Sequence, residues 1–160
     1  MAVEIERKFL VTNDSWRENA EDCTRYVQGY LSREPERTVR VRIAGEKAFL
    51  TIKGKPPEDA PLETPEFEYA IPKADAEAML KICLPGVIDK TRYRIPHEGK
   101  VFEVDEFAGD NAGLVVAEIE LTHSAESFAR PAWLGAEVTE DHRYKNASLS
   151  VTPYGRWPKP

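Results

Sequence analysis

Charged and apolar side chains alternate along this 160-residue chain from its first segment onward, where Glu4, Glu6 and Lys8 fall at every second position. Successive side chains of a β-strand point to opposite faces of the sheet, so these three charges share one face if the segment is a strand. Two carboxylates and an ammonium group in one row are unsuited to an apolar core. The segment therefore predicts a strand whose charged face borders water, ions or a ligand.

The same alternation recurs in later segments, which predicts a mainly β chain with few helices. Gly45 and the 97–100 segment are typical of hairpin turns. The three prolines of the 55–62 segment indicate a loop, and a second loop is expected at 131–135. Short helices are expected at 16–20, 72–83, 124–130 and 141–151, and the predicted strands are 1–10, 25–32, 38–43, 47–53, 64–71, 89–96, 101–107 and 113–122.

Size and charge narrow the functional class. The length fits a single domain over residues 1–160 that can bury its own core. A net charge of -6 and a pI near 5.2 argue against a nucleic-acid or membrane-surface partner. The sequence contains no apolar run suited to a signal peptide or a membrane span, so we expect a soluble cytoplasmic protein, and both a monomer and a homodimer stay open.

The charges of the predicted strands are sorted by sign. A face that is merely solvated explains any one such strand, but it would more often mix the two signs with uncharged polar residues. Like charges in rows repel, so they persist best where a ligand or counter-ions neutralise them. We therefore expect a barrel of about eight strands with a charged lumen, opposed rows and helices packed outside. The basic rows are Arg40, Arg42, Lys53, Lys90, Arg92 and Arg94, and the acidic rows are Glu4, Glu6, Glu66, Glu68, Glu103, Asp105, Glu118 and Glu120.

The spacing within such a lumen suits a linear polyphosphate and a divalent cation. Residues two apart on a strand are separated by roughly 6.5–7 Å and side chains on adjacent strands by about 5 Å. Four carboxylates from two strands suit Mg²⁺ or Mn²⁺, in part through water, while Arg and Lys suit successive phosphates. The predicted metal ligands are Glu4, Glu6, Glu118 and Glu120.

The opening Glu4-Ile5-Glu6-Arg7-Lys8 resembles the ExExK signature of the CYTH, or triphosphate tunnel metalloenzyme, superfamily. ExExK alone is a weak signal, but the resemblance is an ordered series that covers nearly the whole chain. The series continues with Arg40-Val41-Arg42, Lys53, Glu66-Phe67-Glu68, Lys90-Thr91-Arg92-Tyr93, Glu103-Val104-Asp105 and Glu118-Ile119-Glu120.

This resemblance implies an α+β fold built on an eight-stranded antiparallel tunnel that acts on triphosphates with a divalent metal. The chain is most similar to the short bacterial inorganic triphosphatases, in which segments like 28–31 and 90–93 carry a tyrosine and a lysine near the reaction centre. Those residues here are Tyr30 and Lys90. The 137–141 and 144–146 segments also resemble that branch.

Our leading hypothesis is metal-dependent hydrolysis of inorganic triphosphate to pyrophosphate and phosphate. In this hypothesis a carboxylate such as Glu6 orients the attacking water, and Lys90 and Tyr30 polarise the water or the scissile phosphate. The competing hypotheses are a nucleoside or thiamine triphosphatase, a class IV-type adenylate cyclase, and a non-catalytic polyphosphate-binding module. The expected phosphate ligands are Lys8, Arg40, Arg42, Lys53 and Arg92, and further residues with lumen-facing parity are Glu66, Glu68, Arg94, Glu103 and Asp105.

The remaining residues of chemical interest are expected to be structural. The spacing of the three histidines does not bring them together, and Cys23 and Cys83 are expected to be reduced, packed thiols with no zinc site. Arg7 has the opposite parity to Glu4 and should lie at the surface. Packing or rim positions are expected for Trp16, Trp133 and Trp157.

Overall fold

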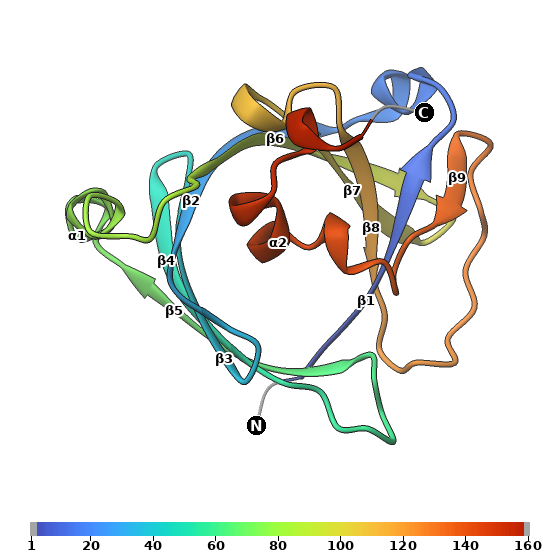
Figure 1. Ribbon diagram of the computed structural model, residues 1–160. Coiled ribbons are helices and arrows are strands. Elements are labelled where there is room, and N and C mark those ends of the chain that lie inside the picture. The colour runs from blue at the N-terminus through green and yellow to red at the C-terminus, as the bar shows by residue number, and fades with distance from the viewer. Residues whose placement is uncertain (1–2, 159–160) are drawn as a thin grey trace.

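Eight antiparallel strands close into a barrel in the computed structural model, which describes residues 3–158 (Figure 1). Residues 1 and 2 of the predicted first strand, and the last two residues of the predicted domain, lie outside the described residues. Around the ring the strands follow the order β1-β5-β4-β3-β2-β6-β7-β8 and return to β1. The strands are β1 (Val3–Val11), β2 (Asp22–Glu34), β3 (Arg37–Ala44), β4 (Lys47–Gly54), β5 (Glu63–Ile71), β6 (Ile88–His97), β7 (Lys100–Phe107) and β8 (Val115–Glu120).

The first strand closes the barrel because different parts of it pair with different neighbours. Its beginning pairs with β5 in the register Val3↔Pro65, and its middle pairs with β8 in the register Lys8↔Glu118. Beyond the start of β5, a short ninth strand, β9 (Leu134–Glu137), pairs with the last residues of β1. The fold is the closed barrel that the sequence predicts, with β9 added at one edge.

Apolar side chains lie on the outside of the barrel, where other segments cover them. The largest cluster includes Phe9, Phe102, Trp16 and Trp133, all buried, so the packing prediction for these two tryptophans is confirmed. The helix α1 (Lys73–Leu80) covers a second cluster on β3 and β4 through Ala76. The polar faces of the strands are thereby left to the lumen.

The C-terminal part of the chain does not stay outside but enters one mouth of the barrel, as Figure 1 shows for α2 (Asn146–Val151). The prediction of one helix over 141–151 is wrong. Lys145 has an extended backbone (φ -69°, ψ 139°), which separates a 3₁₀ turn at His142–Tyr144 from α2. Leu149 is buried against Ile88 and neighbouring apolar residues and so anchors α2.

Three further predictions about local structure are wrong. The 124–130 segment is irregular rather than helical, since the carboxylate of Glu126 accepts hydrogen bonds from the backbone N–H and hydroxyl of Thr122, and Phe128 packs on Phe102. So short a helix is marginal without tertiary support. The predicted loop 131–135 contains the start of β9. Both cysteines are free thiols, but Cys23 is exposed rather than packed.

Candidate active site

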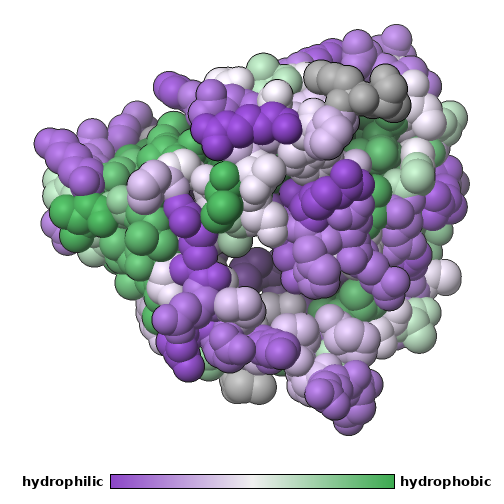
Figure 2. Space-filling model, viewed as in Figure 1, coloured by the Kyte–Doolittle hydropathy of each residue, from purple (hydrophilic) through white to green (hydrophobic). Residues whose placement is uncertain are grey.

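The inward faces of the barrel strands bring the predicted charged rows together. Figure 2 shows the face seen in Figure 1, where hydrophilic residues surround a central hollow. Around the ring the acidic strands β7, β8, β1 and β5 lie side by side, and the basic strands β4, β3 and β6, with β2 among them, form the other half, so rows of opposite sign face each other across the lumen as predicted. Basic and acidic residues lie directly across from each other in the pairs Lys8↔Glu118, Lys53↔Glu66, Arg92↔Asp105 and Arg94↔Glu103.

Asp105 is the anion at the buried centre of this arrangement. Its carboxylate accepts two hydrogen bonds from Arg92, from Nε at 2.7 Å and from Nη2 at 2.9 Å. It also accepts one from Lys90 Nζ at 2.7 Å. Burial alone would raise the pKa of Asp105, but the charges of Arg92 and Lys90 overcome this effect and hold the pKa well below its usual range. Asp105 is therefore an ionised carboxylate that fixes two cations.

Lys90 has an environment suited to chemistry near neutral pH. Its side chain is fully buried, and burial together with the positive charges of Arg92 and Arg42 lowers its pKa to about 7, even though Asp105 acts in the opposite direction. Burial is the larger of these two causes. A lysine with such a pKa can exist in either protonation state under physiological conditions.

Two further lysines contact carboxylates of the acidic strands. Lys8 Nζ lies 3.6 Å from Glu118 Oε1 and 3.8 Å from Glu6 Oε1. Lys53 Nζ lies 3.0 Å from Glu4 Oε2. Burial opposes the charged form of Lys8, yet Glu118 and Glu6 raise its pKa, so this side chain is a stable cation. The present ion-pair partners of these two lysines are thus predicted metal ligands.

The two arginines of β3 differ in how they are paired. Arg42 is half-buried, and its Nε donates to the neutral amide oxygen of Gln28 at 2.7 Å. Burial and the neighbouring Arg40 and Arg92 lower the pKa of Arg42 to about 9. Arg40 Nη2 donates to Thr51 Oγ1 at 3.2 Å and lies 3.7 Å from Glu68. An incoming anion would therefore relieve the repulsion between Arg42 and the neighbouring cations.

The predicted metal ligands form a partly assembled set. Glu6 and Glu120 are directly across from each other on β1 and β8. Burial, followed by the charge of Glu6, raises the pKa of Glu120. Glu4 and Glu118 are held by lysines, and within residues 3–158 no three His, Cys, Asp or Glu side chains are close enough to form a metal-binding group. The four glutamates stay a prediction as metal ligands.

Tyr30 is buried in the lumen, but it does not lie directly across from Lys90. It lies across from Arg40, whereas Tyr26 lies across from Lys90 on β2. Lys90 Nζ is 5.9 Å from the centre of the Tyr26 ring, and Arg42 Cζ is 4.5 Å from it. Tyr26, which the sequence pattern did not single out, is thus an aromatic neighbour of these cations, as is Phe107, whose ring centre lies 5.5 Å from Lys90 Nζ.

Other functional candidates come from uncharged residues and from the C-terminal segment. Gln28 and Asn146 contact the buried cations, and a neutral amide gives no charge pattern that could have marked either one. Lys145 belongs to the same electrostatic group, because partial burial and the charges of Lys8 and Lys53 lower its pKa. Its position could not be foreseen, since a continuous helix was expected there.

Arg94 is an exposed member of the predicted lumen residues. Its side chain is 45% exposed and its guanidinium group lies 3.9 Å from Glu103. Arg94 also lies near Glu21 and Asp22, at the end of the strand pair. Arg7 points outward and pairs with Glu137 at 2.5 Å, as expected for a residue outside the lumen. Neither Arg94 nor Arg7 therefore belongs to the buried part of the site.

Comparisons with known proteins agree with this architecture. The chain is 43% identical over 155 residues to an inorganic triphosphatase of Acetivibrio thermocellus, covering 96% of this chain and 97% of that protein. It is 34% identical to an inorganic triphosphatase of Nitrosomonas europaea, covering 93% and 97% of the two chains. The crystal structure of the inorganic triphosphatase NE1496 superimposes with a TM-score of 0.67 at 34% identity, covering 94% of this chain and 96% of that one. The CYTH domain model matches residues 2–154, so this chain belongs to the CYTH domain family.

Proposed function

We propose that this chain hydrolyses inorganic triphosphate to pyrophosphate and phosphate within the barrel lumen. Its inorganic triphosphatase relatives support this reading, and so does the concentration of basic side chains in an otherwise acidic protein. The observation that carries the proposal is the cluster of the buried Lys90 and Arg92 with the half-buried Arg42, which brings three cationic groups together. Such a cluster suits a compact polyanion.

The charge balance of the lumen supports the use of a divalent metal. Apart from the exposed Arg94, the strands within residues 3–158 contribute six basic and eight acidic residues to the lumen. A triphosphate adds several negative charges, so further positive charge must enter with it. Glu6 and Glu120, with Glu4 and Glu118 beside them, have the oxygen ligands that Mg²⁺ or Mn²⁺ prefers. When bound, the metal would neutralise phosphate oxygens and help to orient the attacking water.

The basic residues have separate tasks in this proposal. Arg42 binds a phosphate oxygen, because its present partner is a neutral amide. Lys8 and Lys53 exchange carboxylate partners for phosphate, and Arg40 and Arg92 complete the phosphate ligands. Their contribution is positioning and charge neutralisation rather than covalent catalysis.

Lys90 is the group closest to the chemical step in the proposed mechanism. Asp105 fixes its amino group, and the incoming phosphates favour its protonated form. In that form Lys90 polarises the scissile phosphate as water attacks in line with the leaving pyrophosphate. Tyr30, buried across from Arg40, borders the same phosphate-binding surface.

A substrate panel tests the proposal. Phosphate release should be measured with tripolyphosphate, ATP and thiamine triphosphate in the presence of Mg²⁺ or Mn²⁺. We expect the highest kcat/KM for tripolyphosphate, because α2 lies at one mouth of the barrel and would leave less room there for a nucleoside (Figure 1). A preference for ATP or thiamine triphosphate would replace the proposed substrate, cyclic AMP formation would indicate a cyclase, and tight binding without turnover would indicate a binding module.

The predictions of cellular location and of partners rest on the amino-acid composition. None of the helices within residues 3–158 has the length and apolar character needed to cross a membrane. A cytoplasmic location and a small-molecule partner, rather than nucleic acid, stay predictions from the acidic composition. Fractionation of cells that express a tagged chain would test the location.

A further inference from the structure

Asn146 is the point at which the C-terminal segment contacts the buried cations. Its side-chain oxygen accepts hydrogen bonds from Lys90 Nζ and from Gln28 Nε2, each at 3.1 Å. Asn146 is the first residue of α2, directly after the extended Lys145, and this break lets its side chain turn into the lumen. An amide at this place supplies an acceptor without adding a charge.

These bonds join two parts of the proposed site that belong to different strands. Gln28 accepts from Arg42 on β3 through its Oε1 and donates to Asn146 through its Nε2. Lys90 on β6 donates to both Asn146 and Asp105. The amide of Asn146 therefore connects a proposed phosphate ligand with the proposed catalytic lysine.

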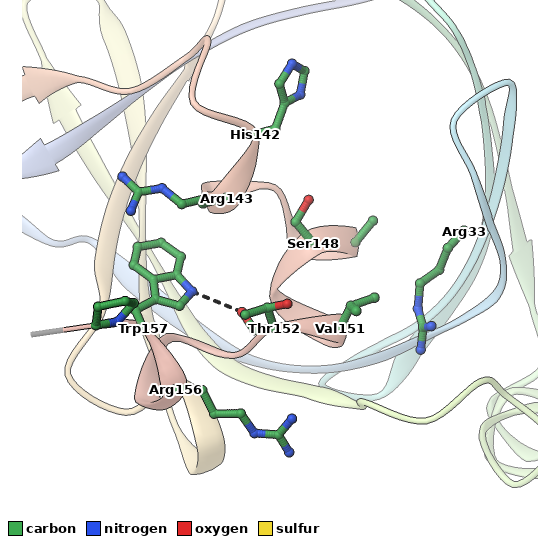
Figure 3. A pocket seen from close by; sticks show the side chains of 10 residues that line it. Arg33, His142, Arg143, Ser148, Val151, Thr152, Arg156 and Trp157 are labelled. Carbon is green, nitrogen blue, oxygen red and sulfur yellow. Dashed lines mark hydrogen bonds between the residues drawn. The ribbon is translucent and has the colours of Figure 1, made fainter.

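The segment that carries Asn146 is held firmly at the mouth. Leu149 is buried in an apolar cluster with Ile88 and Leu114. Trp157 packs on Tyr144 and donates from its indole Nε1 to the carbonyl oxygen of Thr152 at 3.0 Å, the bond drawn in Figure 3. A side chain on so fixed a segment can set the position of a neighbouring group.

The other side of α2 faces a separate cavity. Ser148, Val151 and Thr152 line a space of about 540 Å³ between α2 and Arg33 of β2, as Figure 3 shows. Asn146 is not part of this lining. The helix thus provides an outward residue, Ser148, that serves as a matched control for the inward Asn146.

We propose that Asn146 is a positioning residue for the triphosphatase reaction. Its side chain holds Lys90 and, through Gln28, Arg42 in the geometry that the reaction requires. The proposal rests on the proposed function only for its kinetic test, the turnover of tripolyphosphate. Its structural part, control of Lys90 by Asn146, does not depend on which triphosphate is the substrate.

The proposal predicts the direction in which Lys90 responds to changes at position 146. An acceptor stabilises the charged form of a lysine, so Asn146→Ala should lower the pKa of Lys90, and Asn146→Asp, which adds a negative charge, should raise it. The charged and titratable groups that face Lys90 from the surrounding strands are unchanged in both variants. These groups are Asp105 on β7, Arg92 on β6, Arg42 on β3, Glu118 on β8 and Tyr26 on β2.

The experiment combines NMR and kinetics. The full chain is labelled at the lysine side chains, the Lys90 signal is assigned with Lys90→Met, and the signal is followed through a pH titration in wild type, Asn146→Ala, Asn146→Asp and Ser148→Ala. Steady-state turnover of tripolyphosphate and thermal unfolding are measured on the same samples. We expect opposite shifts of the Lys90 pKa in the two Asn146 variants and none in Ser148→Ala.

In Asn146→Ala, kcat should fall by about 10–100-fold with KM changed less than about threefold, since misplaced catalytic groups slow turnover more than they weaken binding. A Lys90 pKa that is the same in all four proteins would overturn the proposal, as would a loss of kcat that merely follows a loss of folding. If the pKa shifts occur but the wild type does not hydrolyse tripolyphosphate, the proposed function fails while the role of Asn146 in holding Lys90 stands.

Discussion

Replacing Asp105 by alanine is the most direct test of the buried charge network. The substitution removes a carboxylate that accepts two hydrogen bonds from Arg92 and one from Lys90, and it leaves both cations buried without this partner. Loss of one partner from a buried ion pair typically costs about 3–5 kcal/mol. A domain of this size is stable by only about 5–15 kcal/mol, so the change should remove a large part of its stability.

Urea unfolding followed by tryptophan fluorescence measures this loss. At about 2–4 °C per kcal/mol, the melting temperature should also fall by roughly 6–20 °C. Asp89→Ala is the matched control, because Asp89 also lies on a barrel strand and accepts two hydrogen bonds from an arginine, at 3.0 and 2.7 Å. Its partner, Arg25, is 68% exposed, so water replaces the lost contact and the cost should be much smaller.

The same reasoning also predicts how Asp105→Ala and Lys90→Met combine. Lys90→Met should be less harmful in the Asp105→Ala background than in wild type, since it then removes an unpaired cation. Equal losses for Asp105→Ala and Asp89→Ala, or additive effects of Asp105→Ala and Lys90→Met, would refute the reasoning that burial makes this network important.

Four other changes test the remaining parts of the structure. The pKa of Lys90 is lowered from its ordinary 10.5 to about 7, so between these pH values the unfolded chain binds more protons than the folded chain. The free energy of unfolding of wild type should therefore rise relative to that of Lys90→Met as the pH is raised from 7 to 10.5. Glu6→Ala should abolish turnover at ordinary metal concentration with an unchanged melting temperature, and a wild-type rate would remove Glu6 from the metal site. Arg42→Ala should weaken substrate binding by about 1.5–3 kcal/mol, the value of a charge-assisted hydrogen bond, and unaltered KM and kcat would place Arg42 outside the phosphate site. Gly86→Ala should destabilise the chain by more than about 1 kcal/mol, because φ is +99° and the new Cβ would lie 1.9 Å from a carbonyl oxygen of α2. Gly99→Ala, with φ +81° and open space around it, is the control that isolates the clash with α2.

The sequence was sufficient to assign lumen residues wherever a period of two governed the pattern. Charged residues such as Lys53 and Asp105 could be placed on the inner face by parity alone, and the structure puts both there. Parity fixes the face but not the partner across the lumen. The opposed rows form because the acidic strands β7, β8, β1 and β5 are contiguous around the ring, and where the two halves meet, neighbouring strands also pair opposite signs, as Lys53 does with Glu66.

The part of the site that could not be predicted comes from outside the alternating strands. The positions of Lys145 and Asn146 depend on a break in a short helix, and the break depends on packing such as the burial of Leu149. Tertiary contacts decide the conformation of so short a segment more than its own propensity does. Phe128 is a similar case, because its packing against Phe102 holds an irregular loop where a helix was expected.

The lumen combines a rigid part and an exchangeable part, and the proposed reaction needs both. At the centre, Asp105 holds Arg92 and Lys90 at 2.7 Å in full burial, where a change of partner would leave charges unpaired. Toward the mouth, Lys8 lies 3.6 Å or more from its carboxylates, and Lys53 is 26% exposed, so their pairs are longer or more hydrated. A polyphosphate that enters can therefore take these lysines from Glu4, Glu6 and Glu118 at modest cost. The carboxylates released in this exchange are the predicted metal ligands, so binding of substrate and binding of metal should each favour the other.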